Sequence, residues 1–222
     1  MTGTGIQTHQ RSAMLKIKVC GMTMKENMRK IMTLEVDMMG LIFSHESPRA
    51  VKPKRAFIDF LQDTGDIKKV GIFVDPDAQY VQDIIGLYRL DMIQLHGQES
   101  ADFCHLFHNK TEVIKAFGID PFFDFKLLEK YKSSCHYLLF DTRTSRPGGS
   151  GKVFDWELLR EKNIPLPFLL SGGIDGSMAE RILALDLPNL YGIDLNSRFE
   201  SKPGIKDIEK VKRFINEIRS GY

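Results

Sequence analysis

The sequence contains few cysteines, and none of them is placed for a zinc site or a set of disulfides. Its three cysteines, Cys20, Cys104 and Cys135, are an odd number, and no two of them are spaced as C-x-x-C. This pattern excludes a disulfide framework and a zinc knuckle. A chain that keeps its thiols free suits a reducing compartment. We therefore expect a cytoplasmic protein.

An excess of one charge and a long apolar run are also missing. The 31 Lys and Arg residues nearly balance the 29 Asp and Glu residues, so the formal net charge is only +2. That is too little for the basic footprint of a nucleic-acid-binding protein. No apolar run approaches the roughly 18 residues that a membrane span needs, and the polar N-terminal stretch lacks the apolar middle of a signal peptide. We expect no nucleic acid and no membrane as partners, and a disordered extension, 1–14, before one folded domain, 15–222.

Short apolar runs alternate with amphipathic stretches along the whole chain, and the repeat of about 20 to 30 residues is the size of a βα unit. Eight such units in 222 residues predict an α/β fold, a single-domain (β/α)8 TIM barrel. An open doubly wound sheet is the alternative, but its G-x-G-x-x-G motif does not follow the first strand. The predicted strands are 16–22, 38–43, 68–74, 91–97, 111–119, 135–142, 167–173 and 190–196, and the predicted helices include 25–36, 78–88, 99–107, 122–132, 175–184 and 205–219.

Two residues at predicted strand ends could transfer protons, and a TIM barrel places its chemistry at the C-terminal ends of its strands. Cys20 follows the first strand, and the alternation of side chains along a strand puts it on the inner face together with Lys18. A thiol there could act as a base or nucleophile, or it could be a small buried hydrophobe, as we expect for Cys104 and Cys135. Asp141 ends the sixth strand and could be a general acid or the cap of the following turn.

Glycine-rich loops late in the chain resemble an anion site. In TIM barrels, backbone N–H groups of the last loops and of a short helix often hold a phosphate, although glycine also occurs in ordinary turns. Asn196 and Ser197 stand where such a helix would begin, and we expect them to cap it. The glycines expected around the phosphate are Gly149, Gly151, Gly172 and Gly173.

Two further polar residues follow other strands. Arg49, after the second strand, could hold a carboxylate with both arms of its guanidinium, or it could be solvated at the surface. His96 ends the fourth strand in QLHG. No second histidine stands near it at a metal-ligand spacing, which favours a hydrogen-bonded structural histidine, and we expect no metal site.

Seven stretches match one family in order and spacing: KVCGMT, GLIFSHESPR, GIFVD, IQLHGQE, LLFDT…GGSGKVFDW, LSGGI and PGIKD. Between Lys16 and Ile218 the chain resembles phosphoribosylanthranilate isomerase, the barrel enzyme of the tryptophan pathway. The resemblance implies conversion of N-(5-phosphoribosyl)anthranilate to 1-(2-carboxyphenylamino)-1-deoxyribulose 5-phosphate by an Amadori rearrangement. It also implies a small phosphorylated substrate, no metal or organic cofactor, and a monomer or homodimer.

The same resemblance implies a role for each candidate residue. Cys20 would be the general base, Asp141 the general acid, and Arg49 the group that holds the anthranilate carboxylate. Arg198 replaces a family glycine near the phosphate. Either its loop swings outward and leaves it solvated, or its guanidinium contacts that phosphate, and we expect the contact. The substrate-binding residues would be Arg49, His96, Gly149, Gly151, Gly172, Gly173, Asn196, Ser197 and Arg198.

Two other functions fit part of the pattern. The histidine-pathway isomerase performs the same rearrangement on the same fold, but it resembles a doubled half-barrel with acidic catalytic residues. This chain has no half-repeat and has a cysteine after its first strand. A barrel that binds a phosphorylated metabolite without turning it over is the second alternative, and it would not need both Cys20 and Asp141.

Overall fold

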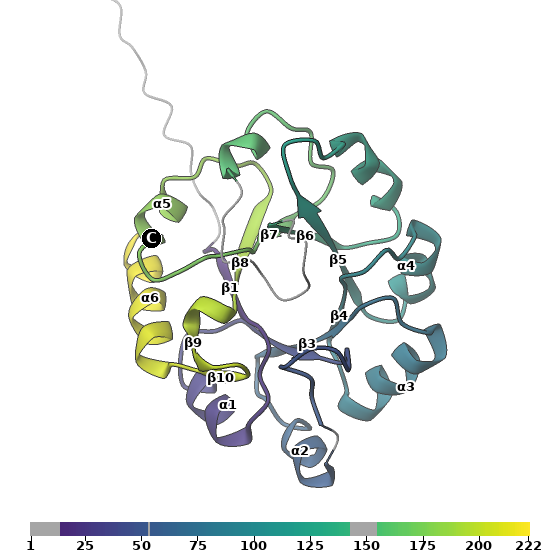
Figure 1. The fold of residues 1–222 in the computed structure, drawn as a ribbon, viewed down its shortest axis with the longest axis vertical. Coiled ribbons are helices and arrows are strands. Elements are labelled where there is room, and N and C mark those ends of the chain that lie inside the picture. Colours follow the sequence, from purple (N-terminus) through teal and green to yellow (C-terminus); the bar gives the residue numbers. More distant parts are fainter. Residues whose placement is uncertain (1–13, 53, 143–154) are drawn as a thin grey trace, which may run out of the picture.

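The computed structural model describes residues 14–52, 54–142 and 155–222. Eight parallel strands form a closed ring in which β8 pairs back onto β1, and Figure 1 looks along this ring with the helices outside it. The predicted TIM barrel is confirmed, and the open-sheet alternative is wrong. The strands are β1 (Lys16–Val19), β2 (Met38–Ile42), β3 (Lys68–Phe73), β4 (Met92–Leu95), β5 (Glu112–Ile119), β6 (Tyr137–Thr142), β7 (Phe168–Leu170) and β8 (Leu190–Leu195).

Helical segments connect the strands and cover the outside of the barrel. None of the helices in the described part of the chain is long and apolar enough to cross a membrane. The α-helices are α1 (Lys25–Met32), α2 (Arg55–Phe60), α3 (Ala78–Tyr88), α4 (Ala101–His108), α5 (Ala179–Leu183) and α6 (Ile208–Ser220), and the 3-10 helices are η1 (Phe125–Tyr131), η2 (Trp156–Leu159) and η3 (Ser197–Phe199).

The barrel strands are buried on both faces, as is usual for a parallel sheet covered by helices. Their outward side chains pack with the helices into the larger of two apolar clusters. Their inward side chains form a separate, smaller cluster inside the ring, which consists of Cys20, Met38, Val70, Ile72, Met92, Ile114, Ala116, Leu139 and Leu169. The inward position of Cys20 agrees with the alternation predicted from the sequence.

The ends of the elements differ from the predicted ends. The first strand was expected to continue to residue 22, but β1 ends at Val19, and Gly21 then turns the chain with a φ of +74°. The last helix begins at Ile208 rather than at 205, because the Asp207 carboxylate accepts a hydrogen bond from the N–H of Lys210 at 3.1 Å. The helix α2 was not predicted, since it is too short to show a clear helical period.

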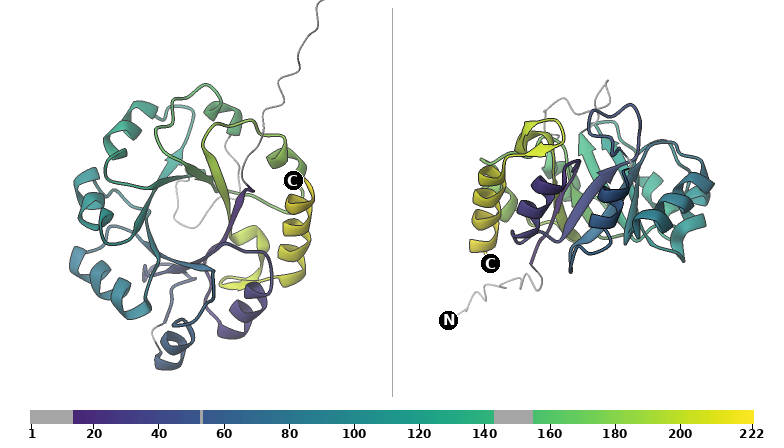
Figure 2. Two further views of the ribbon diagram at one scale, coloured as in Figure 1. Left: turned by 180° about the vertical axis from the view of Figure 1, so that it is seen from behind. Right: turned by 90° about the horizontal axis from the view of Figure 1, so that it is seen from below.

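A small hairpin at one end of the barrel was also missed. Its strands, β9 (Glu200–Lys202) and β10 (Ile205–Lys206), are antiparallel, and Gly204 makes the turn with a φ of +83°. The Asn27 side chain ties the hairpin to α1 by bonding both the N–H of Lys206, at 2.8 Å, and its carbonyl, at 2.9 Å. Figure 2 shows the hairpin beside the first and last helices of the barrel.

The expected N-terminal extension falls outside the described residues except for Met14. The packed barrel begins immediately after it, because Leu15 is already buried.

Candidate active site

Cys20 lies directly after β1, in the interior of the barrel. It is 4% exposed, and its N–H donates to the carbonyl of Leu195 at 2.9 Å. On the neighbouring strand, Gly40 leaves room for the thiol, since a Cβ atom there would lie 2.8 Å from Sγ. Burial raises the pKa of the Cys20 thiol above its ordinary value, and the charge of Lys18 offsets part of that rise.

Lys18 and Asp194 form an ion pair inside the barrel beside this thiol. The two residues are paired in the β1–β8 register, and Lys18 Nζ donates to Asp194 Oδ1 at 2.9 Å. The Lys18 side chain is 0% exposed and that of Asp194 is 5% exposed. Burial alone would lower the pKa of Lys18, but Asp194 outweighs it, and the pKa is raised. Lys18 is therefore an ammonium ion at neutral pH.

Asp141 is the penultimate residue of β6 and lies at the same end of the barrel. Its Oδ1 accepts a hydrogen bond from the N–H of Thr142 at 2.7 Å. Burial in the barrel mouth raises the pKa of this carboxyl to about 6, although the hydrogen bond from Thr142 opposes the rise. Gly172 allows this arrangement, because a Cβ atom there would lie 2.6 Å from Asp141 Oδ1. A carboxyl group with such a pKa can donate a proton near neutral pH.

His96 faces the same carboxyl group. Its Nε2 lies 3.7 Å from Asp141 Oδ2, and its Nδ1 lies 3.2 Å from Gln94 Nε2. Because burial lowers the pKa of His96 to about 4, the ring is neutral and its contact with Asp141 is not an ion pair. An amide donor at Nδ1 leaves the ring proton on Nε2. His96 therefore directs an N–H toward the site, in addition to being hydrogen-bonded as a structural histidine would be.

Arg49 is 8% exposed, so the alternative of a solvated surface arginine is wrong. Its guanidinium binds the carboxylate of Glu200 through Nε, at 2.9 and 3.0 Å, and through Nη2, at 2.7 Å. Gly21 permits the close approach, because a Cβ atom there would lie 2.7 Å from Arg49 Cδ. Among the described residues, none is recorded as accepting a hydrogen bond from Nη1.

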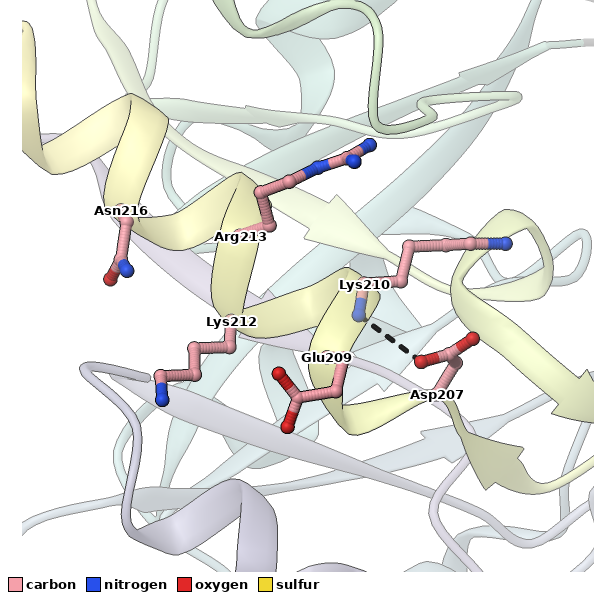
Figure 3. Close-up of a pocket in the computed structure, with 6 residues that line it drawn as sticks. All are labelled: Asp207, Glu209, Lys210, Lys212, Arg213 and Asn216. Atoms are coloured by element: carbon pink, nitrogen blue, oxygen red, sulfur yellow. Dashed lines mark hydrogen bonds between the residues drawn. The ribbon is translucent and has the colours of Figure 1, made fainter.

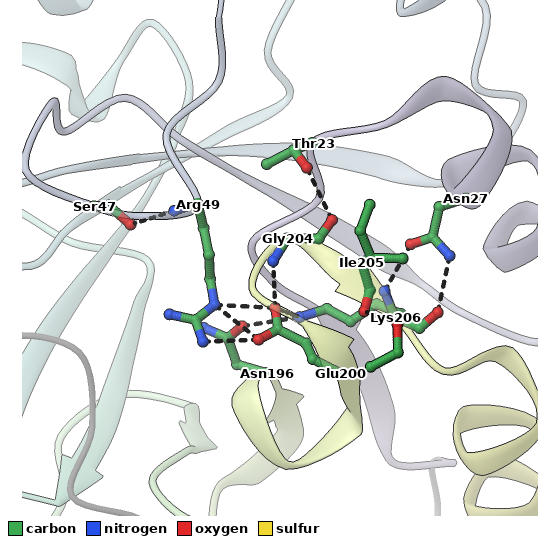
Figure 4. A network of polar contacts seen from close by, with 10 residues as sticks. Thr23, Asn27, Ser47, Arg49, Asn196, Glu200, Gly204, Ile205 and Lys206 are labelled. Atoms are coloured by element: carbon green, nitrogen blue, oxygen red, sulfur yellow. Dashed lines mark hydrogen bonds and ion pairs between the residues drawn. The ribbon is translucent and has the colours of Figure 1, made fainter.

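The β9–β10 hairpin supplies the other half of this network, which Figure 4 shows. Lys206 Nζ donates to Glu200 Oε1 at 2.7 Å and to Asn196 Oδ1 at 2.9 Å. Two cations, Arg49 and Lys206, thus share one buried carboxylate. The expectation that the Asn196 side chain caps the short helix is wrong, because η3 has no side-chain cap and Asn196 Oδ1 accepts a hydrogen bond from Lys206 instead.

The described parts of the expected phosphate site lie in the loops after β7 and β8. Gly172 and Gly173 have φ values of +83° and +70°, a backbone geometry that favours glycine. The pKa of Asp175 is lowered mainly by its hydrogen bond from Ser177, and the charge of Arg198 contributes. That interaction places η3 beside the loop after β7. The two other predicted glycines, Gly149 and Gly151, lie outside the described residues.

A shallow hollow on the outer face of α6 is unrelated to this site. Figure 3 shows its lining, which is solvent-facing and carries both charges: Asp207, Glu209, Lys210, Lys212, Arg213 and Asn216. The opposite face of α6 packs into the barrel. Within the described ranges, no three His, Cys, Asp or Glu side chains are grouped to hold a metal ion.

Four polar residues of the site were missed as functional candidates. Gln94 and Asp194 lie on inward positions of predicted strands, where a polar side chain in an apolar run was the available signal. Glu200 and Lys206 gave no such signal, since the hairpin that carries them was not predicted.

Comparison with known proteins shows the family to which the chain belongs. The sequence profile of N-(5'phosphoribosyl)anthranilate (PRA) isomerase matches residues 17–217. The chain belongs to this family. The N-(5'-phosphoribosyl)anthranilate isomerase of Parabacteroides distasonis is 42% identical over 206 residues, which are 91% of this chain and 92% of that protein.

Solved structures agree. Phosphoribosyl anthranilate isomerase from Thermotoga maritima superposes with a TM-score of 0.81 at 28% identity, over 93% of this chain and 100% of that one. The same enzyme class in complex with reduced 1-(o-carboxyphenylamino)-1-deoxyribulose 5-phosphate gives a TM-score of 0.78 at 25% identity, over 93% and 100% of the two chains.

As a phosphoribosylanthranilate isomerase, the chain is an enzyme of tryptophan biosynthesis that rearranges N-(5-phosphoribosyl)anthranilate. The resemblance inferred from the sequence motifs is confirmed. The family match decides against the histidine-pathway isomerase and against a barrel that only binds its ligand.

Proposed function

We propose that this isomerase works with Cys20 as its general base and Asp141 as its general acid. The observation that carries the proposal is that both groups lie at the same end of the barrel interior. Cys20 directly follows β1, and Asp141 lies near the end of β6. The charges of Lys18 and Asp194 influence the pKa values of both groups. A thiol and a carboxyl group of raised pKa are suited to the two proton transfers that the reaction needs.

The proposed reaction begins when Asp141 protonates the ribose ring oxygen. The C1′–O bond then breaks, and the anthranilate nitrogen stabilises C1′ as an iminium ion. The Cys20 thiolate removes the C2′ proton, which the iminium has acidified, and an enolamine forms. Its tautomerisation to the ketone gives C1′ a proton and removes one from the C2′ hydroxyl, so that the reaction is an isomerisation with no net proton change. The two groups together suffice, and we propose no cofactor.

Turnover by the purified protein tests this function directly. We expect N-(5-phosphoribosyl)anthranilate to be consumed with a change in the fluorescence of its anthranilate group, with no added metal and in the presence of a chelator. Binding of the substrate without any fluorescence change over time would contradict it.

We propose that Arg49 holds the anthranilate carboxylate through Nη1 while Glu200 fixes the rest of its guanidinium. A buried group of two cations and one carboxylate is one negative charge short of neutrality, which supports binding of an anion there. Arg49→Lys loses the planar fork, and a hydrogen bond between charged groups contributes about 1.5–3 kcal/mol. We expect KM to rise roughly 10- to 100-fold while kcat changes little. A phosphoribosylaniline inhibitor, which lacks the carboxylate, is the matched probe and should bind both proteins equally.

We propose that Arg198 adds a charge-assisted contact to the phosphate, next to the N–H groups of Gly172 and Gly173. Such a contact serves ground and transition states alike, because the phosphate does not react. Arg198→Ala should raise KM roughly 5- to 30-fold, for a contact of about 1–2 kcal/mol, and leave kcat unchanged. If KM stays the same, the arginine serves Asp175 rather than the substrate.

We further propose that the protein works in the cytoplasm on a small phosphorylated substrate, as a monomer or homodimer. Its three cysteines are all unpaired and buried, which supports a reducing compartment.

A further inference from the structure

Lys18 is a buried charge that the reaction steps above do not use. An ion pair in a barrel interior loses the hydration of both ions, and an apolar pair of similar size is often at least as stable. Lys18 and Asp194 are nevertheless enclosed, and the Ser171 hydroxyl donates a further hydrogen bond to Asp194 Oδ2 at 3.4 Å. Stability alone is thus a weak explanation for this buried ion pair, and the residues beside it suggest a functional explanation.

Lys18 and Cys20 are two positions apart in the chain, and both are buried inside the barrel. An ammonium group has three N–H donors; Asp194 holds one of them at 2.9 Å, and the charge of Lys18 acts on the nearby Cys20 thiol. Only the thiolate can accept a proton, and a thiolate buried among apolar side chains is unfavourable. Lys18 is the buried cation with the largest influence on it.

We propose that Lys18 is a positioning residue of the isomerase: its ammonium, which Asp194 holds inside the barrel beside Cys20, stabilises the Cys20 thiolate, and the charge of Asp194 limits that stabilisation. This inference rests on the proposed role of Cys20 as the base. It assigns the buried ion pair a function in setting the fraction of enzyme in which that base is ionised.

Charges on other elements also face Cys20, and Lys18 is the strongest favourable one. After burial, the largest influence on the pKa of Cys20 is the lowering by Lys18, followed by the raising by Asp194 and a smaller lowering by Lys206 of β10. Other groups at this end of the barrel are Asp141 of β6, His96 after β4, which is neutral, and the Arg49–Glu200 ion pair. Removal of Lys18 should therefore raise the pKa of the Cys20 thiol, and removal of Asp194 should lower it.

The test is a titration of Cys20 by NMR in the full-length protein labelled with ¹³C at the cysteine Cβ atoms, with the Cys20 signal assigned from Cys20→Ser. Lys18→Met should move the titration to higher pH and lower kcat roughly 10- to 100-fold, as expected for loss of a favourable charge beside the thiolate. Asp194→Asn keeps an acceptor for Lys18 and removes the counter-charge, so it should move the titration to lower pH. The alkaline break in kcat/KM should follow each shift.

Lys115→Met is the matched control, because Lys115 is a second buried lysine, paired with Glu99 at 3.0 Å. It should leave the Cys20 titration in place. Lys18→Met leaves Asp194 without its partner and could fail to fold. In that case Asp194→Asn alone tests the proposal. The double variant, Lys18→Met with Asp194→Asn, removes both charges together.

An unmoved titration in Asp194→Asn, or shifts of the same sign in both variants, would overturn the proposal. These outcomes differ from a failure of the proposed base: turnover by Cys20→Ser would remove Cys20 from the reaction, whereas the NMR titration would still report whether Lys18 controls the thiol.

Discussion

Replacement of Cys20 by serine is expected to lower kcat by about 10²- to 10⁴-fold, the usual contribution of one general base. The hydroxyl has nearly the size of the thiol and fits the space that Gly40 leaves, so binding should persist. It ionises far less readily than a thiol, however, and cannot serve as the base even beside Lys18. The loss corresponds to roughly 3–5 kcal/mol of transition-state stabilisation.

Two measurements make this result specific. The affinity of Cys20→Ser for a reduced product analogue should equal that of the wild type, because the substitution removes a proton acceptor and not a binding contact. Cys104→Ser is the matched control, since Cys104 is an equally buried cysteine in α4, and it should retain kcat. Near-normal turnover in Cys20→Ser would exclude the cysteine as the base.

The second large effect is expected for Asp141→Asn, which should also lower kcat by about 10²- to 10⁴-fold. The amide preserves the shape of the side chain and the acceptor for the N–H of Thr142. It cannot donate an acidic proton to the ribose oxygen. Binding of the product analogue should again be retained.

The pH profile identifies the acid independently of the size of this loss. Asp141 has a pKa of about 6, and the pKa of Cys20 lies above its ordinary value. The reactive form needs a thiolate and a protonated Asp141, so kcat/KM should rise with pH up to about 6 as thiolate accumulates. Between the pKa of Asp141 and that of Cys20, kcat/KM should stay level, because each gain in thiolate is cancelled by an equal loss of protonated Asp141. Above the pKa of Cys20 the activity should fall.

In Asp141→Asn the break near pH 6 should vanish, because the amide does not titrate. The residual activity should instead increase steadily until Cys20 is ionised. An unchanged break in this variant would assign it to another group, with His96, whose pKa is lowered to about 4, as the nearest other titratable side chain.

Local patterns determined the barrel and its two proton-transfer candidates. The alternation of apolar runs and amphipathic stretches predicted eight βα units, and the period of two along each strand predicted that Lys18 and Cys20 share the inner face. Asp141 was placed at a strand end by the same reasoning. These properties depend on residues close together in the chain, so the sequence suffices to recognise them.

Only the tertiary structure decided which charges meet. Arg49 and Glu200 are 151 positions apart, and Lys18 and Asp194 are 176 positions apart. The first pair exists because a hairpin too short to predict folds back over the barrel end, and the second because β8 closes onto β1 in one register. Ionic contacts depend on distances of a few ångströms between side chains, and the closure of the ring sets those distances.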